Sequence, residues 1–499
     1  TAAPAPVKPK VELSPAKKAR LDRKSEKAKT NPFSFPDEAE QFYANSRTGP
    51  VIYRGPNPTT SRPLDPSAYL PAIQALKGMP RFDSSTNSVL APDSRSSIPA
   101  ASAGAALGSW QNLGPNNQGG RTRSLIIDPG NPNVMYAGGV AGGVWKSTDG
   151  GANWSTNTDL VMNNLAVSTL AFQPNNTNVI YAGTGEGVGN GDAVRGAGIF
   201  KSTDGGATWT QLASTANSNF LYVGKILVSP RNPNRVWAAT RTGIFRSLNG
   251  GSTWTNTQTS PSNGCTDMAM QVNRSVGYIF ASCGRTTGQG TIWRALDSDT
   301  GTWTSVMSLD GQGRSSIAVA PSNESIVYVL SAQRNAGGGP GTYGLHGVYR
   351  SLSNGGAGTF TTQRQGNVNP ASTAQKINQL LLSNPIIALL TECGVPSSSS
   401  SFLNQGWYDN AIAVDPTDPA SIYAGVEVGG VMHSADGGET WTDCTDDLAR
   451  LAEERPELRS QLLSDTYLEG MLDTHALVVS PAAPGRPILG NRMGLFQSD

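Results

Sequence analysis

The chain repeats one short motif several times, and such a repeat constrains the fold more than any single residue does. The stretch "GVWKSTDGGANW" at 143–154 returns as "GIFKSTDGGATW", "GIFRSLNGGSTW" and "GVMHSADGGETW", and weaker copies end at Trp303 and Phe360. A residue needed once for chemistry is not repeated in this way, so the motif indicates architecture. The positions that recur are Ser147, Asp149, Trp154, Ser202, Asp204, Trp209, Ser247, Asn249, Trp254, Ser434, Asp436 and Trp441.

A second repeated element precedes each copy of this motif. It consists of two β-rich runs joined by a proline turn, as in "RSLIIDPGNPNVMYAGG", and a shortened version is "MAMQVNRSVGYIFASC". The unit recurs at a spacing of roughly 45 residues and supplies four antiparallel strands, which is typical of a β-propeller. The 57 Gly, 33 Pro and only 15% charged residues also favour an all-β chain. A two-sheet sandwich is the alternative, and the regular period argues against it.

The ends of the repeated region predict how the ring closes. The last unit stops at Asp499 after three strands, and "GSWQNLG" at 108–114 resembles the missing fourth strand. We therefore expect a seven-bladed β-propeller of four-stranded antiparallel blades over 108–499, closed by this N-terminal strand, which removes exposed sheet edges. An eighth blade beyond Asp499 is the alternative. Two insertions, 364–406 and 445–472, contain helix-like sequence.

Residues 1–107 differ in composition from the repeats. The net charge of the chain is +1, yet residues 1–30 hold nine Lys and Arg against three Asp and Glu, and a Ser/Pro/Ala tract follows. We expect an extended, partly disordered, basic and Pro-rich arm with short helices, attached to a protein partner. The arm lacks interleaved aromatic residues, so nucleic acid is not an expected partner, and any membrane contact would be peripheral.

The cysteines bear on the compartment in which the protein folds, because disulfides form in oxidising compartments. No stretch approaches the roughly 18–20 apolar residues that span a bilayer, and the chain opens on Thr1, as in a mature or trimmed form. Cys265 and Cys283 lie symmetrically about a turn, so we expect a cross-strand disulfide, with Cys393 and Cys444 as a second pair. Four buried free thiols are the alternative. The even count favours an extracellular, periplasmic or cell-surface protein.

The "SxDxGxxW" motif on propeller-like repeats resembles the Asp-box, or BNR repeat, over about residues 108–499. The Asp-box superfamily includes sialidases, the sortilin ectodomain and the xyloglucanases of glycoside hydrolase family 74. The resemblance implies that the motif is the turn between the third and fourth strands of a blade. There the carboxylate accepts backbone N–H bonds and the Trp packs between strands, and Asn249 can replace Asp in that role.

The position of these turns also predicts the binding face. The proline turns and the Asp-box turns crowd one face, whereas the long insertions lie on the opposite face, where the first strand of each blade begins at the central channel. Function concentrates on loops carried by a rigid scaffold. The predicted binding residues at this channel opening are Arg121, Arg123, Tyr222, Trp407, Tyr408, Asp473 and His475, with Asp409 and Asn410 beside them. A polar lining that only hydrates the channel is the alternative.

The resemblance leaves the activity open between two classes. No sialidase Arg triad can be assembled from the sequence, and Val140 stands where the family 74 xyloglucanases have an aspartate. The main prediction is a non-catalytic interaction or scaffold module that binds protein or glycan within a larger assembly. The alternative is a polysaccharide-active glycoside hydrolase with Glu427, Glu186 and Asp473 as candidate carboxylates. The three histidines show no metal-ligand spacing, so no metal or cofactor is expected.

Overall fold

The computed structural model describes nine segments of the repeated region and one short hairpin before it. The segments are 121–188, 193–260, 264–285, 288–334, 344–366, 406–425, 431–443, 474–491 and 494–497. The hairpin pairs β1 (Arg81–Asp83) with β2 (Ser88–Leu90) in antiparallel register. The predicted arm over 1–107 otherwise lies outside the described residues, as do the closing strand at 108–114 and most of the insertions 364–406 and 445–472.

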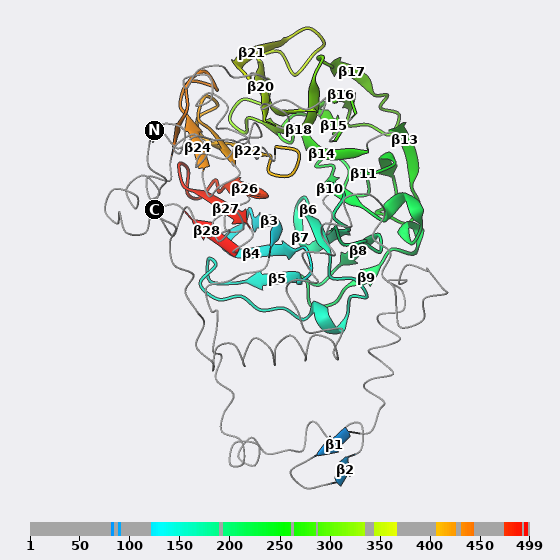
Figure 1. Ribbon diagram of the computed structural model, residues 1–499. Coiled ribbons are helices and arrows are strands. Elements are labelled where there is room, and N and C mark those ends of the chain that lie inside the picture. The colour runs from blue at the N-terminus through cyan, green and yellow to red at the C-terminus, as the bar shows by residue number, and fades with distance from the viewer. Residues whose placement is uncertain are drawn as a thin grey trace, which may run out of the picture. The chain divides into compact units, whose positions relative to one another are not determined.

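The described chain is an all-β propeller, in which small sheets stand around a common centre (Figure 1). Five sheets have four strands, each paired antiparallel with the next along the chain. Their strands are β6 (Val167–Gln173), β7 (Asn176–Thr184), β8 (Ile199–Ser202), β9 (Thr210–Gln211); β10 (Val223–Val228), β11 (Val236–Thr240), β12 (Gly243–Ser247), β13 (Thr255–Thr259); β14 (Cys265–Met270), β15 (Tyr278–Cys283), β16 (Thr291–Leu296), β17 (Thr304–Met307); β18 (Gln312–Val319), β19 (Val327–Gln333), β20 (Leu345–Ser351), β21 (Phe360–Gln365); and β22 (Ala411–Val414), β23 (Ile422–Gly425), β24 (Val431–Ser434), β25 (Thr442–Asp443).

Two further sheets have three strands within the described residues. They are β3 (Thr122–Asp128), β4 (Asn131–Gly139) and β5 (Gly143–Ser147), and β26 (Ala476–Val479), β27 (Pro487–Asn491) and β28 (Gly494–Gln497). A single bridge from Lys146 to Ser155 lies at the free edge of β5. The only helical segments described are the short 3-10 turns η3 (Thr158–Leu160), η4 (Ala213–Thr215) and η5 (Ser218–Phe220). The seven-blade count with an N-terminal closing strand stays a prediction.

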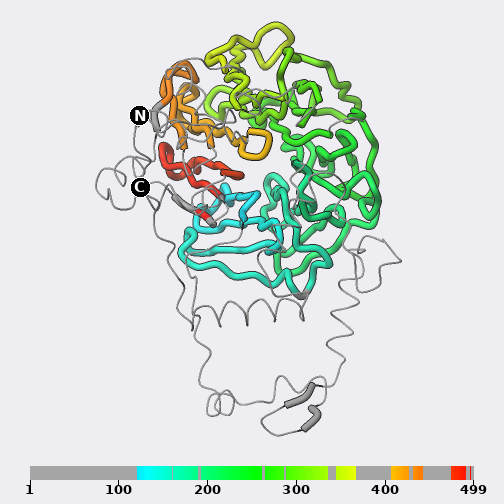
Figure 2. Tube along the Cα trace, viewed as in Figure 1, coloured from blue at the N-terminus to red at the C-terminus, as the bar shows by residue number. Residues whose placement is uncertain are grey.

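The hydrophobic core lies between neighbouring sheets. The second strand of a sheet is covered on both faces, which explains its apolar runs, and all of β11 is buried. One cluster joins Leu125 and Met135 of the first sheet to Ala476 and Ile488 of the last. The last sheet, red in Figure 2, therefore packs against the first, cyan one, and the ring is closed by side-chain packing.

Glycines in the repeated "YAG" sequence permit this close approach of sheets. A Cβ added to Gly183 at the end of β7 would lie 2.7 Å from Cγ1 of Val223, the first residue of β10. Such a distance is well inside van der Waals contact. The small residue is thus required where the first strand of the next sheet crosses.

Each repeated "SxDGG" turn is held by its own side chains. In the first copy, Asp149 Oδ1 accepts from Ser147 Oγ at 2.8 Å and from the Asn153 backbone N–H at 2.9 Å. The Gly151 N–H donates to Ser147 Oγ at 2.9 Å, and Trp154 Nε1 donates to the Gly151 carbonyl at 2.9 Å. The same bonds recur around Asp204, Asn249 and Asp436. Gly150 and Gly151 have φ of 73° and 95°, which favour glycine.

Cationic side chains on the third strands connect each turn to the preceding sheet. Lys146 Nζ donates to the Gly205 carbonyl at 3.0 Å, and Lys201 Nζ donates to the Gly250 carbonyl at 3.3 Å. Arg246, Arg294 and Arg350 make the corresponding bonds further along the chain. The repeated turn therefore anchors adjacent sheets as well as its own strands.

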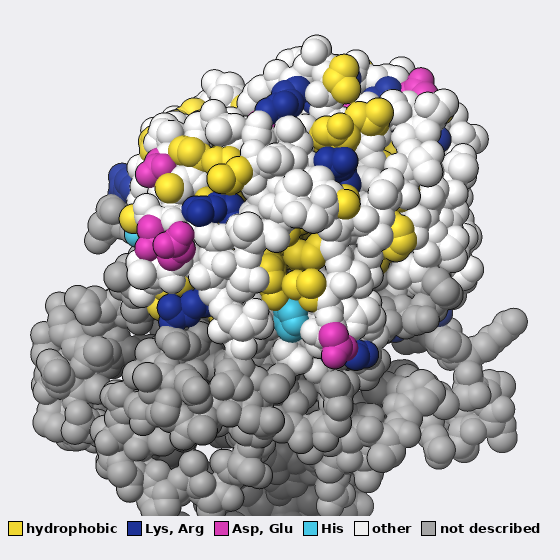
Figure 3. Space-filling view, turned by 90° about the horizontal axis from the view of Figure 1, so that it is seen from above, with side chains coloured by type: hydrophobic (Ala, Val, Ile, Leu, Met, Phe, Trp, Pro, Cys, Tyr) yellow, Lys and Arg dark blue, Asp and Glu magenta, His cyan; other side chains and the backbone are white. Residues whose placement is uncertain are grey.

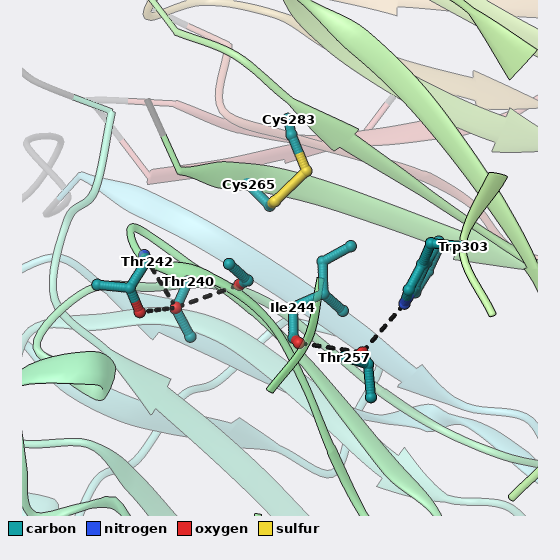
Figure 4. Close-up of a disulfide and its surroundings, with 8 residues drawn as sticks. Thr240, Thr242, Ile244, Thr257, Cys265, Cys283 and Trp303 are labelled. Atoms are coloured by element: carbon teal, nitrogen blue, oxygen red, sulfur yellow. Dashed lines mark hydrogen bonds between the residues drawn. A yellow bond between two sulfur atoms is a disulfide. The ribbon is translucent and has the colours of Figure 1, made fainter. Parts of the chain in front are cut away.

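The predicted Cys265–Cys283 disulfide is confirmed (Figure 4). The two cysteines are register partners on β14 and β15, as expected from their symmetric placement about the turn. Nearby, Trp303 Nε1 donates to Thr257 Oγ1 at 3.0 Å and links this sheet to the previous one. The proposed partners Cys393 and Cys444 lie outside the described residues. The disulfide indicates folding in an oxidising compartment, such as the extracellular space or the periplasm.

The carboxylates of the repeated turns should make the stability of the fold depend on pH in the acid range. Hydrogen bonds from Thr208 and Ser202 lower the pKa of Asp204 to about 2. Since an unfolded Asp titrates at about 3.9, the ionised form of Asp204 stabilises the fold above about pH 4, and this contribution is lost as the pH falls toward 2. We expect Asp204→Asn to flatten the loss of stability between pH 4 and pH 2, measured by denaturant unfolding.

The control for this experiment is Asp310→Asn, because the Asp310 side chain is 96% exposed and belongs to no repeated turn. Asn249 shows that an amide can make the same turn bonds, so Asp204→Asn should keep the fold at neutral pH. Identical pH profiles for the Asp204 variant and the wild type would contradict a stabilising role for the charge.

Candidate functional site

The first strand of every sheet contributes to a central cavity of about 160 Å³. Its lining includes Arg123, Thr169, Lys225, Asp267, Arg314, Asn410 and His475, each from the start of a different first strand or the residue before it. Several of these strands begin with a β-bulge, as between Thr122 and Ser124 and between Gln312 and Ser315. Bulges turn side chains at a strand end, and here they surround one opening of the channel. We call this opening, with the adjacent residues described below, the channel mouth.

Glu186 is the centre of a buried ionic cluster at the channel mouth. It follows β7 and is 2% exposed. Arg123 donates to Glu186 Oε1 from Nη2 at 2.7 Å and from Nε at 3.0 Å, and Arg121 Nη2 donates to Oε2 at 3.2 Å. Tyr408 OH adds a bond to Oε1 at 3.3 Å. Both carboxylate oxygens of Glu186 therefore accept hydrogen bonds from donors within the protein.

Tyr408 joins the two arginines to the cluster. Arg121 Nη1 donates to Tyr408 OH at 2.6 Å, and the Arg123 guanidinium lies 4.3 Å from the centre of the Tyr408 ring. Burial raises the pKa of Tyr408 above its ordinary value. Burial would lower the pKa of Arg123, but the nearby Tyr408 and Glu186 hold it above its ordinary value. Trp407 lies beside Tyr408, with ring centres 5.4 Å apart.

A buried Asp–His pair lies against the same cluster. His475 Nδ1 is 3.2 Å from Asp409 Oδ1 and 3.1 Å from Arg123 Nη1, and its ring stands edge-on to Tyr408 at 4.8 Å. The side chains of Asp409 and His475 are fully buried. This pair therefore connects the sheets that begin at β22 and β26 to the first sheet.

Arg314 is a channel residue that the sequence analysis missed. It donates to the Tyr408 carbonyl at 2.8 Å and the Asn410 carbonyl at 3.3 Å. Burial, and then the charge of Arg123, lower its pKa to about 10. Arg121, Arg123 and Arg314 thus converge, although no arginine triad could be assembled from the sequence. All three are engaged by protein groups, so this convergence does not define a ligand-binding triad.

Tyr222, Arg241 and Arg285 also lie at the channel mouth. The Arg241 guanidinium lies 4.5 Å from the centre of the Tyr222 ring. Arg285 Nη1 donates to the Gly187 carbonyl at 3.1 Å, next to Glu186. Burial, followed by the charge of Arg241, lowers the pKa of Arg285 to about 10. Lys225 pairs with Asp267 at 3.8 Å nearby.

The predicted binding residues thus fall into two groups. Arg121, Arg123, Tyr408 and His475 are brought together with Trp407 alongside, and Tyr222 lines the same cavity. Glu427 and Asp473 lie outside the described residues. In the described part of the chain, no cluster of His, Cys, Asp or Glu has the makings of a metal site. Nor does that part contain a helix of the length and hydrophobicity that crossing a membrane requires.

This combination defines a class of protein: a β-propeller with a charged, partly aromatic opening to its central channel. Comparison by sequence finds a xyloglucanase of Hypocrea jecorina, 27% identical over 204 residues, which are 39% of this chain and 23% of that protein. No protein-family model matches the chain.

Solved structures also match the fold. A GH74 enzyme of Niastella koreensis superposes with a TM-score of 0.50 and 20% identity over 77% of this chain and 53% of that one. YCF48 from Cyanidioschyzon merolae has a TM-score of 0.44 and 14% identity over 77% of this chain and 96% of that one. The chain therefore spans less than a quarter of the xyloglucanase and about half of the GH74 enzyme that it matches.

The sequence similarity to a xyloglucanase overturns the prediction of a non-catalytic scaffold and favours the hydrolase alternative. That prediction gave too much weight to Val140, which replaces the expected aspartate. Val140 is buried, and its N–H donates to the Arg121 carbonyl at 3.0 Å. One substituted turn position carries less information than similarity over 204 residues.

Proposed function

We propose that this chain is a polysaccharide-active glycoside hydrolase, built on an Asp-box propeller, that acts at the channel mouth. The sequence similarity to a xyloglucanase is the observation that carries the proposal. The reaction would add water across a glycosidic bond, placing OH on the anomeric carbon and a proton on the leaving oxygen. Such hydrolysis uses two carboxyl groups, one to donate the proton and one to act as base or nucleophile.

Glu186 fits neither carboxyl role well. A proton donor must face the leaving oxygen of the sugar, whereas the carboxyl group of Glu186 is ion-paired with Arg121 and Arg123 inside the protein. A base or nucleophile must have a free oxygen directed at the sugar, whereas both oxygens of Glu186 accept bonds from buried donors. We therefore assign Glu186 to positioning Arg121, Arg123 and Tyr408.

The reacting pair is then assigned to Glu427 and Asp473. Glu427 lies two residues after β23, and Asp473 lies two residues before His475. The cavity of about 160 Å³ is small for an oligosaccharide, so a polysaccharide would lie across the mouth rather than enter the channel.

The test is release of reducing ends from a panel of neutral and acidic polysaccharides by the full chain. We expect release from at least one β-linked plant or microbial polysaccharide, and loss of that release in the double variant Glu427→Gln and Asp473→Asn. Asp310→Asn is the matched control, because it makes the same chemical change at an exposed site. Absence of release from every polysaccharide tested would contradict the proposal. We further propose secretion or attachment at the cell surface, where such substrates occur.

A further inference from the structure

Positive charge exceeds negative charge at the channel mouth among the described residues. The cations are Arg121, Arg123, Lys225, Arg241, Arg285 and Arg314, and the carboxylates are Glu186, Asp267 and Asp409. On the face shown in Figure 3, small groups of basic and acidic side chains lie among uncharged ones.

Most of these cations already have partners. Arg121 and Arg123 bind Glu186, Lys225 pairs with Asp267, and Arg314 donates to main-chain carbonyls. Arg241 and Arg285 differ, because neither makes an ion pair within the described segments. Both side chains are partly buried, and removing a guanidinium group from water without a counter-ion is unfavourable.

Geometry places this remaining pair at the channel mouth. Arg241 lines the cavity and lies over the Tyr222 ring, and Arg285 reaches the carbonyl of Gly187, the residue after Glu186. Arg285 Nε is buried and has no hydrogen-bond partner in the described structure. Both arginines reach Gly187, since a Cβ added to Gly187 would lie 3.4 Å from Cγ of Arg241, while Arg285 donates to the Gly187 carbonyl. A bound anion would supply the missing acceptor and separate the like charges.

We infer that Arg241 and Arg285, with Tyr222, form a subsite for the carboxylate of a uronic acid, so that the ligand is an acidic polysaccharide. The guanidinium fork matches a carboxylate in a paired, planar geometry, which a neutral sugar hydroxyl cannot reproduce. This inference rests on the proposed function for the glycan part of the ligand. The charge requirement comes from the arginine pair alone.

The test is calorimetric titration of the full chain with oligogalacturonate and with a neutral xyloglucan oligosaccharide of equal length, under conditions without turnover. We expect the acidic ligand to bind at least about tenfold more tightly. Arg241→Gln and Arg285→Gln should each remove at least about tenfold of that affinity. Arg486→Gln is the matched control, since it removes one positive charge from an exposed turn at the other end of the sheets.

Three results would overturn the subsite: equal affinity for the two ligands, unchanged affinity in both arginine variants, or equal affinity for a sulfated oligosaccharide without carboxylates. Circular dichroism spectra of the variants establish that they are folded, and Arg285→Lys, which keeps the charge but loses the fork, should bind with intermediate affinity. The affinity should also fall as salt rises from 0.05 to 0.5 M, as for a charge pair.

Failure of this inference differs from failure of the proposed function. Selective binding of oligogalacturonate without any sugar release would refute the hydrolase and retain the subsite. Sugar release from neutral polysaccharide, with no preference for the acidic ligand, would retain the hydrolase and refute the subsite.

Discussion

Replacing Glu186 by alanine is expected to lower the free energy of unfolding by about 3–5 kcal/mol, because it leaves buried arginines without their counter-ion. The side chain of Arg123 is 7% exposed and that of Glu186 is 2% exposed, so water cannot replace the lost carboxylate. Denaturant unfolding of both proteins at neutral pH measures the difference. Added salt should change this difference in unfolding free energy only slightly, because ions in solution screen a buried pair weakly.

The matched control is Glu439→Ala. Glu439 pairs with Arg350 at 3.7 Å but is 61% exposed, so its loss should change stability by about 0–1 kcal/mol. Combining Glu186→Ala with Arg123→Ala should cause less destabilisation than the sum of the two single changes, since the unpaired charge is then removed. Equal effects of the Glu186 and Glu439 variants would contradict the picture of a buried ionic centre.

Replacing either proposed reacting carboxylate should reduce turnover by about 10²–10⁴-fold while leaving the fold intact. Glu427→Gln and Asp473→Asn keep the size of each side chain but remove its ability to donate or accept the proton at the sugar. The measurement is the initial rate of reducing-end release on the best substrate, together with thermal unfolding of each variant.

The stability of the variants distinguishes the expected role of Glu427 and Asp473 from that of Glu186. The Glu186 variant should be destabilised, whereas the Glu427 and Asp473 variants should unfold near the wild-type temperature. The conservative Asp310→Asn control should keep full activity. A near-normal rate for either amide variant would remove that residue from the reacting pair.

The repeated sequence predicted much of the fold because each unit makes the same local contacts. Alternating apolar runs, proline turns and the "SxDGG" motif located the strands, and symmetric spacing identified Cys265–Cys283 as neighbours. Closure of the ring depends on packing between residues far apart in the chain, such as Leu125 and Ala476. From the sequence alone, contact between the first and the last sheet can be predicted only after a number of blades has been assumed.

The site was predicted in part, and the missed residues have physical explanations. Arg121, Arg123, Tyr408 and His475 were found by counting back, because each lies six or eight residues before the proline of its turn, which is Pro129, Pro416 or Pro481. In β18, the same count gives Gly313 and Ser315, but a bulge between Gln312 and Ser315 brings Arg314 to the channel instead. Arg241 and Arg285 were not predicted, because they follow second strands outside the long insertions on which the prediction of a binding face relied.

Glu186 shows why residue type alone did not define its role. Its position near the mouth was recognised from sequence, but the paired donors come from residues 63, 65 and 222 positions away. Those contacts convert a candidate reacting carboxylate into one that holds other side chains. Only the three-dimensional arrangement contains that information.

The central claim is that the chain hydrolyses a glycan, and labelled water tests it most directly. The full chain is incubated with its best polysaccharide in H₂¹⁸O, and the released oligosaccharides are analysed by mass spectrometry. Hydrolysis predicts one ¹⁸O atom at the new reducing end of each product, absent in the double Glu427→Gln and Asp473→Asn variant. Bound but uncleaved polysaccharide, or unlabelled products with a new double bond, would contradict the account.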